Sequence, residues 1–209
     1  MSAESAAASR LGILGGTFDP PHYGHLVLAE NARVQLALDQ VLFVLAGQPP
    51  HKPDRPITSV HHRLAMLQAA IEDNPGFVIS RVDIERPGPH YTVETLALLH
   101  TDHPKADFFF LLGSDSLSEF AHWRDANGIL GQTHLAVMQR PGYNPDLSVL
   151  TAQVPSLKER LVWVDAPHLD LASTDLRRRV SQRLPMRYLV PPRVEEYVRG
   201  HGLYLGEGG

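Results

Sequence analysis

The sequence contains no cysteine, so disulfides, thiolate zinc sites and cysteine nucleophiles are all excluded. It also has no apolar run approaching the roughly 20 residues of a membrane-spanning helix. Residues 1–10, MSAESAAASR, lack the basic start and the apolar stretch of a signal peptide. We therefore expect a soluble, cytoplasmic protein with a flexible leader at 1–10 and a flexible tail at 205–209.

An excess of positive charge is missing as well. Lys and Arg together number 19 against 23 Asp and Glu, which gives a formal net charge of −4. Such a chain has no general attraction for nucleic acid or for an anionic membrane surface. We expect neither as a partner, and a polyanionic substrate would need local basic groups.

Short apolar runs alternate with helix-like stretches along the chain. Runs of strand length lie at 11–14, 41–45, 108–112, 135–137 and 161–164. Apolar residues at three- and four-residue spacing predict helices at 24–38, 59–71, 92–100 and 174–184. This alternation predicts an α/β fold: one domain over 11–204, built on a doubly wound parallel sheet. Such sheets bind ligands at the carboxyl ends of their strands.

The most informative stretch is GGTFDPPHYGH at 15–25, which leaves a predicted strand and enters a predicted helix. Gly15 and Gly16 let a phosphate approach the backbone, and the N–H groups at a helix start favour anionic oxygen. His22 and His25 can point at one spot and donate hydrogen bonds to a phosphoryl group. The alternative is a turn with a surface or metal-binding histidine pair. The whole string favours phosphate binding, because one geometry explains every element of it.

The segment His22-Tyr23-Gly24-His25 resembles the H-x-G-H signature of the adenylyl- and cytidylyltransferases. The long form is similar to that of the bacterial nicotinate mononucleotide adenylyltransferases. The resemblance continues through PPHK at 49–52, HYTVETL at 90–96, LLGSD at 111–115, Trp123, MQRPGY at 138–143, STDLR at 173–177 and the segment 188–204. It covers nearly all of the chain after the leader, departs from the pattern at Ala172, and implies the Rossmann-like nucleotidyltransferase fold.

For ATP, the resemblance implies a site made by the two glycine- and hydroxyl-rich segments. It assigns ATP binding to Gly15, Gly16, Thr17, Phe18, His22, His25, Gly113, Asp115, Ser173, Thr174 and Arg177, and catalysis to His22, His25, Lys52 and Arg177. Ser173 and Thr174 precede a basic helix, so their hydroxyls are also expected to cap it. Asp115 follows a strand, where it suits ribose hydroxyls, a hydrated magnesium ion or a helix cap.

For the acceptor, the resemblance implies a site at Lys52, Tyr91, Thr92, Trp123 and Arg140. Aromatic faces suit a flat pyridine ring, and a hydroxyl at a helix start suits its carboxylate. Arg140 suits the mononucleotide phosphate. A lone tyrosine or tryptophan is as often core or surface. We expect Trp163, Phe108 to Phe110 and the four methionines to be core.

The implied reaction joins nicotinate mononucleotide to the AMP moiety of ATP. Magnesium is expected to bind mainly through the ATP phosphates, since the sequence offers no evident metal cage. Three alternatives stay open: a transferase using nicotinamide mononucleotide or phosphopantetheine, a non-catalytic ATP-binding regulator, and a dehydrogenase. The last lacks the G-x-G-x-x-G fingerprint after its first strand. A homo-oligomer also stays open.

Overall fold

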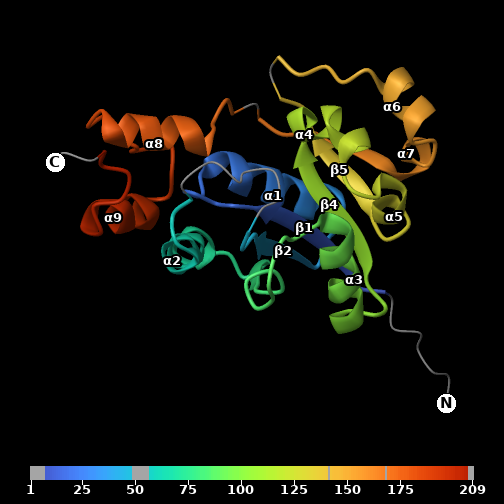
Figure 1. The fold of residues 1–209 in the computed structure, drawn as a ribbon, viewed down its shortest axis with the longest axis horizontal. Helices are drawn as coiled ribbons and strands as arrows, with labels where there is room; N and C mark the ends of the chain where they lie inside the picture. The colour runs from blue at the N-terminus through green and yellow to red at the C-terminus, as the bar shows by residue number, and fades with distance from the viewer. Residues whose placement is uncertain (1–7, 49–56, 141, 168, 207–209) are drawn as a thin grey trace.

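The computed structural model describes residues 8–48, 57–140, 142–167 and 169–206 (Figure 1). Six parallel strands form one sheet in the order β3-β2-β1-β4-β5-β6. The strands are β1 (Arg10–Gly16), β2 (Gln40–Leu45), β3 (Phe77–Ser80), β4 (Asp107–Gly113), β5 (His134–Met138) and β6 (Leu161–Val164). The predicted doubly wound α/β fold is thereby confirmed, with the strand order reversing between β1 and β4.

Helices cover both faces of this sheet. They are α1 (Tyr23–Gln35), α2 (Val60–Ile71), α3 (Thr92–Asp102), α4 (Ser114–Ser118), α5 (Ala126–Leu130), α6 (Leu147–Gln153), α7 (Leu157–Arg160), α8 (Ser173–Ser181) and α9 (Pro192–Gly200), with a 3₁₀ turn η1 (Phe120–His122). Buried residues of α1, α2, α8 and α9 share one hydrophobic cluster, and those of α3 to α7 share the other. Figure 1 shows α8 and α9 at the end of the molecule next to α1 and α2, away from the N-terminus.

The central strands are continuously apolar because helices cover both faces of the sheet. In β4, Phe108 and Phe110 pack into one cluster, while Phe109 and Leu111 pack into the other. Both faces of the sheet are buried from solvent here, so no position along the strand favours a polar side chain. The expectation that Phe108 to Phe110 are core is therefore confirmed, as it is for Met66, Met138 and Met186; Met1 lies outside the described residues.

Several local expectations differ from the structure. Trp163 is 45% exposed, so its placement in the core was wrong; it lies on β6, an edge strand with one neighbour. The edge strand β3 was not predicted, because only Phe77 of its four residues is buried. The helices α4 to α7 and α9 were also missed.

The expected caps of α8 are wrong too. The helix includes Ser173 and begins after Ala172, which makes no side-chain cap hydrogen bond. It ends at Ser181, three residues before the predicted end, and Arg183 adopts a left-handed φ of 59° just beyond it. In the described part of the chain, no helix is both long and apolar enough to cross a membrane.

Candidate functional site

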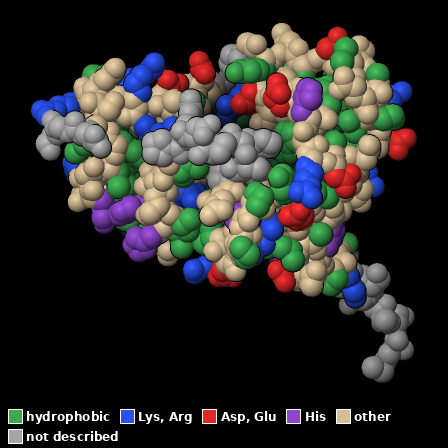
Figure 2. Space-filling view, in the orientation of Figure 1, with side chains coloured by type: hydrophobic (Ala, Val, Ile, Leu, Met, Phe, Trp, Pro, Cys, Tyr) green, Lys and Arg blue, Asp and Glu red, His purple; other side chains and the backbone are tan. Residues whose placement is uncertain are grey.

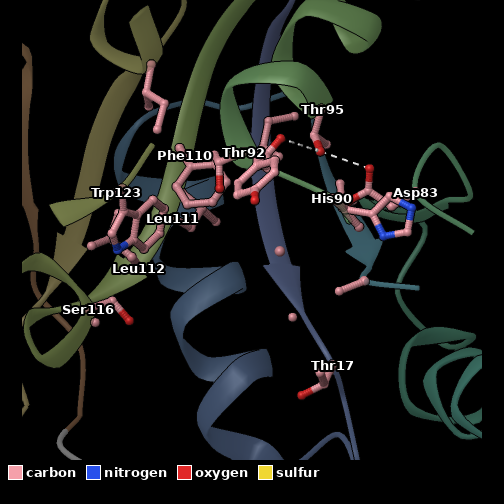
Figure 3. A pocket seen from close by; sticks show the side chains of 18 of the residues that line it. Thr17, Asp83, His90, Thr92, Thr95, Phe110, Leu111, Leu112, Ser116 and Trp123 are labelled. Carbon is pink, nitrogen blue, oxygen red and sulfur yellow. Dashed lines mark hydrogen bonds between the residues drawn. The ribbon is translucent and has the colours of Figure 1, made fainter. Parts of the chain in front are cut away.

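A cavity of about 370 Å³ opens where β1, β2 and β4 end (Figure 3). Ten of the residues proposed from the sequence line it: Gly15, Gly16, Thr17, Tyr91, Thr92, His25, Gly113, Asp115, Trp123 and Arg140. In Figure 3, Trp123 lies on one side of the cavity and the His90–Asp83 pair on the other, with Thr92 between them. The carboxyl edge of the sheet thus brings together segments from both halves of the chain, as predicted for this fold.

The two histidines meet at the start of α1. His22 is the N-cap, with extended backbone, and its N–H donates to His25 Nδ1 at 3.2 Å. Their rings stack with centroids 3.8 Å apart. Only His25 is among the cavity-lining residues; His22 is 2% exposed beneath it.

Burial sets the charge of His22. Desolvation first, and then the positive charge of Arg140, lowers the pKa of His22 from 6.5 to about 3. The imidazole is therefore neutral near pH 7 and carries one N–H. Its Nδ1 has no hydrogen-bond partner among the described residues.

Small residues and a buried aromatic shape this turn. A Cβ on Gly24 would approach His22 Nδ1 to 3.0 Å, so the glycine of the H-x-G-H segment lets the ring pack against the helix. Phe18, with φ of 47°, is 1% exposed and packs edge-on against His25 at 5.0 Å between centroids. Phe18 thus supports the His25 ring from the core and is absent from the cavity lining.

The start of α8 lies against the same turn, although its residues are not among those that line the cavity. Ser173 Oγ donates to the Pro20 carbonyl at 2.9 Å. Arg177 Nη1 donates to the Asp19 carbonyl at 2.6 Å, and its Nη2 donates to Thr174 Oγ1 at 3.3 Å. The two segments expected to bind ATP phosphates are therefore neighbours. Lys52, the remaining proposed catalytic residue, lies outside the described residues.

At the end of β4, Asp115 and Arg140 form an ion pair. Arg140 Nη1 donates to Asp115 Oδ2 at 3.2 Å, and Ser114 Oγ accepts from the Arg140 backbone N–H at 2.8 Å. A Cβ on Gly113 would overlap Asp115 Oδ1 and lie 2.8 Å from Arg140 Nε, so glycine makes room for the pair. That oxygen and that nitrogen are buried without hydrogen-bond partners in the described part of the chain.

The proposed acceptor residues converge at the start of α3. Tyr91 is its N-cap and Thr92 its first residue, which confirms the predicted helix start. The Trp123 ring packs perpendicular to Phe110, with centroids 5.9 Å apart. One face of Tyr91 is covered by the guanidinium of Arg124, 4.3 Å from the ring centroid, so a bound pyridine would have to use the other face or the edge.

Sequence reasoning missed a polar wall of the cavity. Asp83 accepts from Thr95 Oγ1 at 2.8 Å and from Arg86 Nη2 at 2.9 Å. His90 Nδ1 accepts from the Gln48 N–H at 3.0 Å, so its Nε2 carries the proton that faces the Arg86 carbonyl at 3.2 Å. The only signal was the position of His90 at the head of HYTVETL.

A buried arginine was also missed. Arg63 is 1% exposed, and its Nη1 donates to the carbonyls of Thr17 at 3.0 Å and Ala46 at 2.7 Å. It ties together the loops that leave β1 and β2. A charge three residues before Met66, on the apolar side of α2, was the available signal.

Comparisons with known proteins agree with this architecture. The model of the cytidylyltransferase-like family matches residues 13–179. A Thermomicrobium roseum protein named "Probable nicotinate-nucleotide adenylyltransferase" is 50% identical over 94% of this chain and 92% of its own length. A protein of the same name from a Roseiflexus species is 46% identical over 95% and 99%.

Among solved structures, the nicotinic acid mononucleotide adenylyltransferase of Plasmodium falciparum, complexed with NaAD, superposes with a TM-score of 0.75. The match covers 94% of this chain and 97% of that one at 22% identity. At that identity the likeness shows the shared fold.

Proposed function

This chain belongs to the nicotinate-nucleotide adenylyltransferases of the cytidylyltransferase-like family, and from that membership we propose that it adenylylates nicotinate mononucleotide. An oxygen of the mononucleotide 5′-phosphate bonds to the α-phosphorus of ATP. The bond from that phosphorus to the bridging oxygen breaks, and pyrophosphate leaves with the electron pair. The products are nicotinate adenine dinucleotide and pyrophosphate, and the proposal assigns the step to cytoplasmic NAD biosynthesis.

The observation that carries this proposal is the shared cavity. Its lining includes the two glycines that end β1 and a helix-start histidine: Gly15, Gly16 and His25. The lining also includes an aromatic residue and a second helix start, Trp123 and Thr92. One cavity can therefore hold a phosphate chain and a flat anionic ring together, as a reaction between two nucleotides requires.

The chemistry needs positioning and charge stabilisation. The incoming phosphate is already an anionic nucleophile, so no side chain has to form a covalent intermediate. In our proposal His25 donates to the phosphoryl oxygens as charge develops, and neutral His22 holds the His25 ring by stacking. Arg177 and Lys52 are proposed to hold the outer phosphates and the leaving pyrophosphate.

On the acceptor side, we propose that Trp123 stacks on the pyridine and that Tyr91 bounds it. The hydroxyl and backbone N–H groups at Thr92 would bind the nicotinate carboxylate. Arg140 would bind the mononucleotide phosphate, in competition with its own partner Asp115.

Magnesium fits this site as a companion of ATP. In the described residues no group of three His, Asp or Glu side chains could hold a metal, but Asp115 offers a buried oxygen without a partner there. We propose that Asp115 adds at most one ligand to an ion held mainly by the phosphates. When bound, the ion would neutralise phosphate charge.

Pyrophosphate release from ATP and magnesium tests the proposal, with nicotinate mononucleotide, nicotinamide mononucleotide and phosphopantetheine compared side by side. We expect pyrophosphate release with the two mononucleotides and little or none with phosphopantetheine. The kcat/KM should be highest with nicotinate mononucleotide. Preference for phosphopantetheine would indicate a different transferase. No release with any acceptor would favour an ATP-binding regulator.

A further inference from the structure

Tyr204, in the last described turn of the chain, contacts the turn between β1 and α1. We call the latter the phosphate-binding turn, after its proposed role. The Tyr204 hydroxyl donates to Asp19 Oδ1 at 2.6 Å, across 185 positions of sequence. Asp19 is 3% exposed and belongs to the GGTFDPPHYGH segment, between Gly16 and His22. None of the roles assigned above uses either side chain.

Every acceptor atom of Asp19 has a donor. Its Oδ2 accepts from the Thr58 N–H at 3.2 Å, and its carbonyl accepts from Arg177 Nη1 at 2.6 Å. A carboxylate held on both oxygens is a fixed structural anion, unsuited to moving a proton during turnover. The backbone carbonyl of the same residue fixes where the Arg177 guanidinium lies.

The C-terminal segment holds this turn at neighbouring points too. Ser173 Oγ donates to the Pro20 carbonyl at 2.9 Å, and the Tyr23 N–H donates to the Leu189 carbonyl at 3.1 Å. The turn between β1 and α1 is therefore braced by α8 and by the segments on both sides of α9. Of these contacts, only the one from Tyr204 reaches the Asp19 side chain.

We propose that Tyr204 is a positioning residue of the ATP-phosphate site, acting through Asp19 to fix the phosphate-binding turn and the Arg177 guanidinium. The proposal rests on the proposed function for the identity of the phosphate. Displacements of about 1 Å in such groups cost up to about a hundredfold in rate. Tyr204 thus links the C-terminal end of the fold to the chemistry.

Two further observations support this role. Burial, and then the neighbouring carboxylate of Asp19, raises the pKa of the Tyr204 hydroxyl, so the group remains a donor across the neutral range. The Tyr204 backbone has φ of 65°, in the left-handed region that a bulky residue rarely adopts. Glycine would adopt this φ without that strain, so the strained backbone holds a side chain that makes the contact with Asp19.

The test compares two tyrosine-to-phenylalanine variants from the same C-terminal segment. Tyr204→Phe removes the donor to Asp19. Tyr197→Phe is the matched control, because its hydroxyl lies 3.0 Å from His62 Nδ1, between α9 and α2. Figure 2 shows histidine side chains gathered over that surface, which belongs to no part of the cavity lining.

We expect Tyr204→Phe to weaken ATP binding about tenfold, because the turn and Arg177 would no longer be held in the positions proposed to bind the phosphates. Its KM for nicotinate mononucleotide should stay within about twofold of wild type. Tyr197→Phe should change neither constant, although both variants lose some thermal stability. If Tyr204→Phe matches Tyr197→Phe in ATP binding and in kcat, the contact is merely structural and the proposal is wrong.

Asp19→Asn is a second variant of the same contact, and it tests the proposal by itself if Tyr204→Phe does not fold. It should reproduce the loss in ATP binding. Where both single variants fold, the double variant should lose little more than either one, because the two side chains act as one unit. Fully additive losses would overturn the proposal. Calorimetric titration with ATP and magnesium, without acceptor, measures ATP binding even if the wild type releases no pyrophosphate. Failure of the proposed function can therefore be distinguished from failure of the proposal for Tyr204.

Discussion

Arg140 Nη1 donates to Asp115 Oδ2 at 3.2 Å in the lining of the cavity, where the Arg140 side chain is 26% exposed and that of Asp115 is 30% exposed. The cation proposed for the mononucleotide phosphate is therefore already paired with an anion. Phosphate binding must compete with that pairing, and removal of Arg140 would leave the carboxylate of Asp115 facing the incoming phosphate.

We therefore predict that Arg140→Met raises the KM for nicotinate mononucleotide about tenfold or more, while the KM for ATP changes less. Adding Asp115→Asn should recover part of that loss by removing the repulsion. Arg178→Met, on the exposed surface of α8, is the control for loss of a surface arginine. Equal weakening of both substrates would argue against a phosphate contact specific to the acceptor.

His25→Ala should lower kcat by roughly a hundredfold or more, the usual result of removing one preorganised transition-state donor. His25 lines the cavity, so its loss should affect the reaction more than the fold. Steady-state kinetics and a thermal melt would be compared with those of His61→Ala, an exposed histidine of α2. A kcat near that of the wild type would remove His25 from the mechanism.

His22 predicts a pH dependence of stability. Burial, and then Arg140, lowers its pKa in the folded protein to about 3, whereas the unfolded chain binds the proton near pH 6.5. Between these values the unfolded state holds more protons, so the free energy of unfolding falls as the pH falls. The contribution is complete above about pH 6.5 and is lost progressively below it.

Urea unfolding of wild type and His22→Gln at about pH 7.5 and about pH 5 measures this contribution. The wild type should lose about 2 kcal/mol more than the variant between these two values. All other residues are the same in both proteins, so the difference isolates His22. The same loss in both proteins would mean that His22 is not held neutral by the fold.

Acceptor choice tests the start of α3. Nicotinate and nicotinamide mononucleotides differ only in a carboxylate against an amide, so the wild type should prefer nicotinate at least about tenfold in kcat/KM. Thr92→Val should narrow that preference without abolishing it, because the backbone N–H groups of the helix start remain. Thr101→Val, near the other end of the same helix, should leave the ratio unchanged.

Trp123→Ala should behave differently and raise the KM for both acceptors by similar factors, since the two pyridine rings present nearly the same surface. The ratio of kcat/KM for nicotinate mononucleotide to that for nicotinamide mononucleotide distinguishes carboxylate binding at Thr92 from ring stacking at Trp123. A changed ratio in Trp123→Ala together with an unchanged ratio in Thr92→Val would refute this assignment of the pocket.

The alternation of apolar runs and periodic stretches was sufficient to predict the parallel sheet and the edge at which its cavity opens. The continuous apolar content of a central strand such as β4 indicates burial on both faces of the sheet. The glycine pair, Thr92 and Asp115 could be placed in one cavity for the same reason. The glycines end β1, and Thr92 and Asp115 lie in the first turns of α3 and α4, all at the carboxyl edge of the sheet.

Tertiary structure alone decided which side chains pair. The contact between Tyr204 and Asp19 joins opposite ends of the chain, and no periodicity reports it. The exposure of Trp163 follows from its position on an edge strand, which its apolar neighbours do not reveal. The sequence motif does not distinguish His22 from His25. In the structure His22 is buried and neutral, whereas His25 lines the cavity. Local sequence patterns indicate which face of a helix or strand is buried. The pairing of side chains and their protonation states depend on how distant elements pack against that face.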